Sequence, residues 1–224
     1  MIMPKGTSSI SEIRKKITKT HDLISTSFHE AGHTVFALLH LMRVNYVSVF
    51  ENKKLKRIHG VTYYDYPSDL ETIEDSDLLN VLARAEIGVN YAGLIAEKML
   101  FKSISGSNQT PMFISYGSTE DNKAARELIK KYNIVTPGPK TSLYKKKLSR
   151  EIQNELNIHW DAVTAVSHAL FRHRKLDFEG LQLLLTKKTK NKKFWKEQFK
   201  KISYFYNNSE ELDENDLKII LSSK

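Results

Sequence analysis

The stretch His29-Glu30-Ala31-Gly32-His33 governs how the rest of this chain is interpreted. An α-helix turns about 100° and rises ~1.5 Å per residue, so histidines four positions apart lie on one face, about 6 Å apart along the axis. Their imidazoles can then bind a single zinc ion. Glu30 follows the first histidine, where its carboxylate is placed to reach a water on that zinc and to act as a general base.

Apolar residues around the motif recur at spacings of three and four, which predicts a helix from about residue 22 to residue 42. The stripe consists of Ile24, Phe28, Ala31, Val35, Leu38 and Met42. The two histidines lie beside it and would face a half-buried cleft. Gly32 is a poor helix former, but it would let another element approach closely. The motif alone is loose, because two neighbouring histidines also fit ordinary surface or core positions.

The composition is that of a globular protein with one substantial domain, or a domain plus an appendage: 224 residues, 40% hydrophobic and 27% charged. The absence of cysteine excludes disulfides and thiolate metal sites. No apolar run reaches the ~20 residues that span a bilayer, and the N-terminus has no signal-peptide core. We therefore expect a cytoplasmic protein without a transmembrane segment.

The net charge of +9 is compatible with a nucleic-acid or acidic-membrane partner, and equally with lysines spread over a solvated surface. No helix-turn-helix or zinc-finger spacing occurs, so we do not expect a nucleic-acid partner. The phosphate-binding pattern Gly-x-x-x-x-Gly-Lys-Ser/Thr is also missing, which argues against an NTPase.

The remaining pattern predicts a mainly α-helical fold with a small β-sheet or hairpin beside the motif helix. Strands are expected at 44–50 and 58–64, where Gly60 indicates a bulge or a close backbone approach. An exposed edge there would bind an extended peptide, although a purely structural sheet fits the composition equally well. Helices are expected at 77–100, 120–132, 152–172 and about 178–185, with loops at 102–117 and 133–150.

This pattern divides the chain into three parts. Residues 1–20 are expected to form an N-terminal arm with a short helix, and residues 21–186 the main domain. Residues 187–224 change character, because lysines alternate with aromatic residues and an acidic stretch follows. We therefore expect a C-terminal basic-aromatic appendage there.

A zinc site with two helical histidines needs a third protein ligand and an open position for water. The compact pattern with a third histidine six residues later is absent, because that position is Leu39. Spacing does not choose among the other candidates, which are Glu86, Glu97, Asp121, His59 and His159.

Four motifs in this order resemble the protease domain of the FtsH family of ATP-dependent zinc metalloproteases. They are Phe28-His29-Glu30-Ala31-Gly32-His33, the segment 44–64, Ala92-Gly93-Leu94-Ile95-Ala96-Glu97, and Gly117-Ser118-Thr119-Glu120-Asp121-Asn122-Lys123-Ala124-Ala125. The resemblance covers residues 20–186. Ala92-Gly93-Leu94 departs from the family's Gly-Gly-Arg, and the family's ATPase module and membrane segments have no counterpart here.

The resemblance implies a zincin-type zinc endopeptidase in which Asp121 is the third ligand beside His29 and His33, and Glu30 is the base. Its substrates would be unfolded or flexible protein segments, cut without ATP unless a separate ATPase partner unfolds them. The related domains form hexameric rings, so a homo-oligomer is an open expectation. Glu97 would be either a partner that orients a ligand histidine or a structural ion pair.

A competing hypothesis is a catalytically dormant domain of this family that acts as a binding or regulatory module. The basic-aromatic segment 187–201 would then dock a partner. Glu30 argues against this hypothesis, because a retired protease often loses its base.

Overall fold

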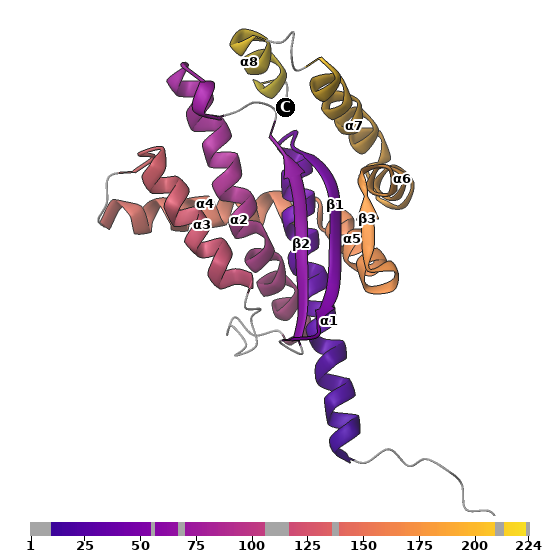
Figure 1. Ribbon diagram of the computed structural model, residues 1–224. Helices are drawn as coiled ribbons and strands as arrows, with labels where there is room; N and C mark the ends of the chain where they lie inside the picture. The colour runs from indigo at the N-terminus through magenta and orange to yellow at the C-terminus, as the bar shows by residue number, and fades with distance from the viewer. Residues whose placement is uncertain are drawn as a thin grey trace, which may run out of the picture.

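The computed structural model describes residues 10–54, 57–66, 70–105, 117–135, 139–208 and 213–222. Within these ranges the fold is mainly α-helical with a small three-stranded antiparallel sheet, as expected (Figure 1). The elements are α1 (Ile10–Leu39), β1 (Arg43–Asn52), β2 (Arg57–Asp65), the 3-10 helix η1 (Leu70–Thr72), α2 (Ser76–Ser105), α3 (Gly117–Lys131), α4 (Pro139–Ile158), α5 (Trp160–His173), β3 (Lys175–Asp177), α6 (Phe178–Lys188), α7 (Lys192–Asn207) and α8 (Glu214–Ser222).

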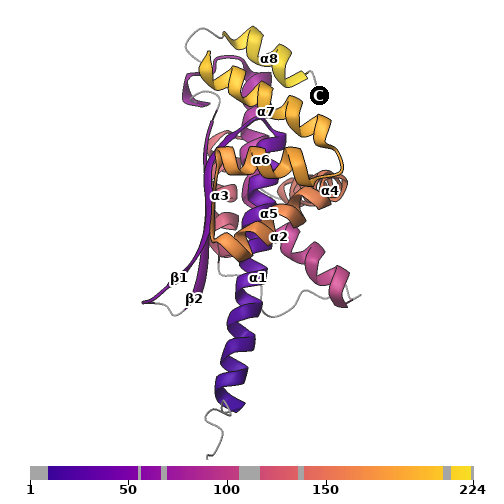
Figure 2. The ribbon, with the colours of Figure 1, turned by 90° about the vertical axis from the view of Figure 1, so that its right-hand side faces the viewer.

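Helix α1 carries the His29–His33 motif and forms the centre of the molecule. It packs along α2 and against α5, and the sheet covers another side of it. Its first turns project away from the helical body (Figures 1 and 2). No glycine or proline occurs between Ile10 and Ala31, so the short helix expected in residues 1–20 and the motif helix are one continuous helix. Residues 1–9 lie outside the described residues.

The sheet has the order β2-β1-β3, so β2 is an edge strand among the described residues. Figure 2 shows the sheet edge-on along one face of the helices. Both expected strands are present, and Val49 pairs with Gly60 while Val47 pairs with Thr62. The register irregularity lies between Val44 and Tyr46 rather than at Gly60. Strand β3, which pairs with β1, was not expected from the sequence.

Two expectations in the second half of the chain are wrong. The loop expected at 133–150 ends at Pro139, which is the first residue of α4. Proline suits that position, because the first turn of a helix has no intrahelical partner for its N–H groups. The single helix expected at 152–172 is two helices, broken at His159, whose φ of -107° and ψ of 26° leave the helical region.

The basic-aromatic segment contributes to the same hydrophobic core as α1. Trp195 and Phe199 on α7 have 0% of their surface exposed. Gln198 Nε2 donates to the carbonyl oxygens of Leu38 at 2.7 Å and Leu39 at 3.1 Å. It thereby satisfies carbonyl groups that the end of α1 leaves without an intrahelical partner. The lysines of α7 lie mostly on its outer face.

The two longest helices, α1 and α2, have 30 residues each. In the part of the chain that the structure describes, neither these nor any other helix is long and apolar enough to cross a membrane.

Candidate metal centre

His29 and His33 lie one turn apart on the side of α1 that faces α2, and both are buried, with 2% and 6% exposed surface. Their Nε2 atoms are 2.9 Å apart. This proximity follows from the helix, because residues four positions apart lie one above the other on the same face.

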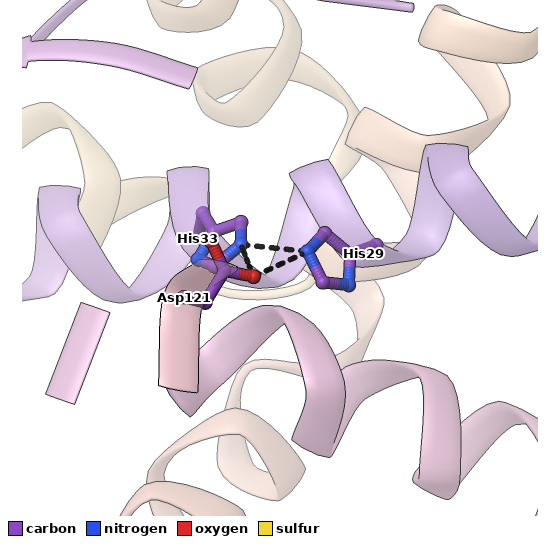
Figure 3. Close-up of side chains that lie close together, drawn as sticks. All are labelled: His29, His33 and Asp121. Atoms are coloured by element: carbon purple, nitrogen blue, oxygen red, sulfur yellow. Dashed lines mark hydrogen bonds and ion pairs between the residues drawn. The ribbon is translucent and has the colours of Figure 1, made fainter. Parts of the chain in front are cut away.

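Asp121 reaches the two histidines from α3, near the start of that helix. Its Oδ2 atom is 2.9 Å from His29 Nε2 and 3.4 Å from His33 Nε2. Figure 3 shows the three side chains converging on one another. The ligand atoms all lie within 4.8 Å of each other. Two imidazole nitrogens and a carboxylate oxygen are a donor set that leaves a fourth zinc position open.

Among the described residues, none of the four other third-ligand candidates belongs to this group. His59 and His159 lie against aromatic rings, in the sheet and at the α4–α5 junction respectively. Glu86 lines a neighbouring cavity. Glu97 lies behind one of the two imidazoles.

Each imidazole has a polar neighbour at its Nδ1 atom, on the side of the ring away from the cluster. These neighbours orient the rings so that both Nε2 atoms point toward Asp121. His33 Nδ1 is 2.6 Å from the carbonyl oxygen of Val89. A carbonyl oxygen only accepts, so Nδ1 carries the proton and the neutral ring presents its lone pair at Nε2. His29 Nδ1 is 3.6 Å from Glu97 Oε2, which favours the same tautomer. Both rings therefore have the arrangement that a metal ligand needs.

The charges at this centre fit a divalent cation. Glu97 is fully buried, and Ser25 Oγ donates to its Oε1 atom at 2.7 Å. Burial lowers the pKa of His29, but the interactions with Asp121 and Glu97 outweigh it and raise the pKa to about 10. Burial also raises the pKa of Asp121, yet the two histidines hold that pKa well below its usual value. With Glu30, three carboxyl groups surround two imidazoles.

Glu30 lies against strand β2 and lines the same cavity as His33 and Asp121. Its Oε2 atom accepts a hydrogen bond from Thr62 Oγ1 at 2.7 Å. A Cβ atom at Gly60 would lie 2.3 Å from Glu30 Cγ and 2.4 Å from Oε1, so only a glycine leaves room for this side chain. The close approach expected at Gly60 is therefore confirmed. A cavity of about 230 Å³ brings Glu30, His33 and Asp121 together with residues 60–62 of β2.

Two further glycines allow α1 and α2 to meet at the centre. A Cβ atom at Gly32 would lie 2.6 Å from the carbonyl oxygen of Ala92, which confirms the expected close packing there. A Cβ atom at Gly93 would lie 2.4 Å from His33 Nε2 and 2.8 Å from His29 Nε2. The backbone of α2 at Gly93 therefore packs directly against both imidazoles.

The roles of Thr62, Ser25 and Gly93 at the site were not predicted from the sequence. Gly93 had a detectable signal, because a glycine inside a strongly helical pattern often marks close packing. Thr62 and Ser25 had none, since their roles depend on a strand register and on a contact between α1 and α2 that no local pattern encodes.

No family model matches this sequence, and no curated protein matches it.

Proposed function

We propose that this protein is a zinc-dependent endopeptidase that hydrolyses peptide bonds in unfolded or flexible protein segments without ATP, through a zincin-type domain that resembles the FtsH protease domain. One observation carries the proposal. The Nε2 atoms of His29 and His33 and a carboxylate oxygen of Asp121 lie within 4.8 Å of one another. Glu30 lines the same cavity as His33 and Asp121.

In this mechanism His29, His33 and Asp121 would hold the metal, whose charge would polarise the scissile carbonyl and make the attacking water more acidic. Glu30 accepts a proton from the attacking water and returns it to the leaving amine nitrogen. The Thr62 hydrogen bond holds Oε2 of Glu30, which leaves Oε1 to receive the proton. Glu97 and the Val89 carbonyl keep the two imidazoles in the ligand tautomer.

The position of β2 favours a peptide substrate. Among the described residues β2 has β1 as its partner on one side only, and residues 60–62 line the cavity with Glu30. An extended segment added to that edge would form backbone hydrogen bonds and bring one of its carbonyl groups to the metal centre. Only an unfolded or flexible segment can become an extra strand, which accounts for the proposed substrate class.

The test is degradation of unfolded casein in the absence of ATP by the wild type, Glu30→Gln and Glu179→Gln. Glu179 is exposed on α6, so its substitution is a matched control for the change of charge. We expect the wild type and the control to cleave casein, and Glu30→Gln to bind zinc without cleaving. Equal cleavage by Glu30→Gln would overturn the mechanism. A wild type that binds zinc but leaves casein intact would favour the dormant binding module.

A further inference from the structure

A second cavity, of about 340 Å³, adjoins the candidate active site between β2, α2 and α3. Both cavities are lined by Tyr64 and Asn90, so they share a wall. Figure 1 shows β2 at the edge of the sheet, on the side of α2 and α3. The mechanism proposed above makes no use of this second cavity.

A peptide bound along β2 passes this cavity close to the scissile bond. Thr62 lines the first cavity and Tyr64, two residues further along β2, lines both. Strands rise about 3.3 Å per residue, so this step is about 7 Å. The second cavity would therefore receive a substrate side chain about two residues from the scissile bond, in the direction of Tyr64.

The walls of the second cavity combine apolar surface with a half-buried carboxylate. Tyr64, Ala124 and Leu128 supply the apolar part, and Glu86 supplies the carboxylate. Burial raises the pKa of Glu86, against the opposing effects of the Lys131 charge and of the Tyr66 hydroxyl. A carboxylate that has lost part of its hydration binds a cation more strongly than a fully hydrated carboxylate does.

The other two charged groups of this cavity leave room for such a cation. The Nζ atom of Lys131 forms an ion pair with Glu71 Oε1 at 2.6 Å, which offsets part of the Lys131 charge that acts on Glu86. The side chain of Glu127 is 69% exposed, which places it at the rim rather than inside. The cavity therefore combines apolar walls with the Glu86 carboxylate, and this combination suits a long side chain that ends in a cation.

We propose that this cavity is the substrate-specificity site of the enzyme and accepts a lysine or arginine side chain, with Glu86 binding the cation. The inference rests on the proposed peptidase function, and it narrows the substrates to flexible segments with a basic residue near the cleaved bond.

The first test is the cleavage profile of the wild type on unfolded proteins, read by mass spectrometry of the products. We expect lysine and arginine to be enriched at one fixed position, one to three residues from the cleaved bond. Active cleavage with no basic enrichment at any fixed position would overturn the inference while leaving the peptidase function intact. This profile needs no variant, so it decides the question even if substitutions at Glu86 prevent folding.

The second test compares two peptides that differ at this position, one with lysine and the other with norleucine, which has a similar shape and no charge. We expect the wild type to favour lysine about tenfold in kcat/KM, since a hydrogen bond to a charged group is worth about one decade. Glu86→Gln should bring this ratio close to one, and the control Glu179→Gln should keep it. A ratio that Glu86→Gln does not change would overturn the role of Glu86.

The third test measures binding without cleavage, by fluorescence anisotropy of the same labelled peptides on Glu30→Gln. We expect tighter binding of the lysine peptide, and loss of that difference in the double variant Glu30→Gln, Glu86→Gln. Equal binding of both peptides by Glu30→Gln would contradict the specificity site. This measurement separates the two proposals, because failure of the peptidase function alone would abolish cleavage and leave the lysine preference in binding.

Discussion

Replacing Gly93 by alanine should weaken zinc binding strongly while leaving most of the fold intact. The new Cβ atom would lie 2.4 Å from His33 Nε2 and 2.8 Å from His29 Nε2, whereas ordinary contacts begin at 3.4 Å. The nearer imidazole or the α2 backbone must therefore move by about 1 Å, and metal-ligand distances tolerate only about 0.2 Å. We expect zinc affinity to fall about 100-fold or more. Crowding costs about 1–3 kcal/mol of stability, offset by ~1 kcal/mol of helix propensity.

The matched control is Gly88→Ala, on the same helix. Its Cβ atom would lie 2.5 Å from the Phe36 ring, so the crowding is similar but no metal ligand is touched. Zinc affinity would be measured by competition with a chromophoric chelator, and stability by urea unfolding. We expect the control to lose stability and keep its zinc affinity. Wild-type zinc affinity in Gly93→Ala, or an equal loss in both variants, would refute the reasoning.

Three further substitutions test other contacts. Glu97→Gln removes the negative charge next to His29 Nδ1, so zinc affinity should fall about tenfold in the same competition assay. An unchanged zinc affinity would exclude a role of Glu97 in positioning His29. Thr62→Val removes the hydroxyl that holds Glu30 and should lower kcat/KM for peptide cleavage about tenfold at full zinc content; a loss of zinc instead would contradict this role. Gln198→Leu keeps the volume but removes the buried amide that donates to the Leu38 and Leu39 carbonyls, and should lower the free energy of unfolding by about 2 kcal/mol. A change below about 0.5 kcal/mol in urea unfolding would contradict that contact.

The parts of the fold that follow from local patterns were predictable from the sequence. The helix around His29 and His33 and the two strands after it have clear periodicity, and the structure contains all three. The break at His159 was not predictable, because no glycine or proline marks it. The packing of Trp195 into the core also escaped prediction, since its lysine neighbours give the segment the composition of an exposed tail.

Residue spacing indicated the candidate site only where its residues are close in sequence, and Asp121 was predicted from the family resemblance instead. His29, Glu30 and His33 are on one helix, so spacing alone indicates their chemistry. Asp121 is 92 positions after His29, and spacing left it equal to four other candidates. The structure groups Asp121 with the two histidines because α3 packs on α2 and α2 packs on α1. A tertiary arrangement of this kind leaves no periodic signal in the chain.

The most direct test of the central claim is native mass spectrometry of the protein purified from zinc-containing medium, beside Asp121→Ala. We predict one zinc ion per wild-type chain, and little or no zinc in the variant at the same free zinc concentration, since two histidines alone are an incomplete ligand set. A wild-type chain without zinc, or an Asp121→Ala chain that retains it fully, would contradict the proposed metal centre.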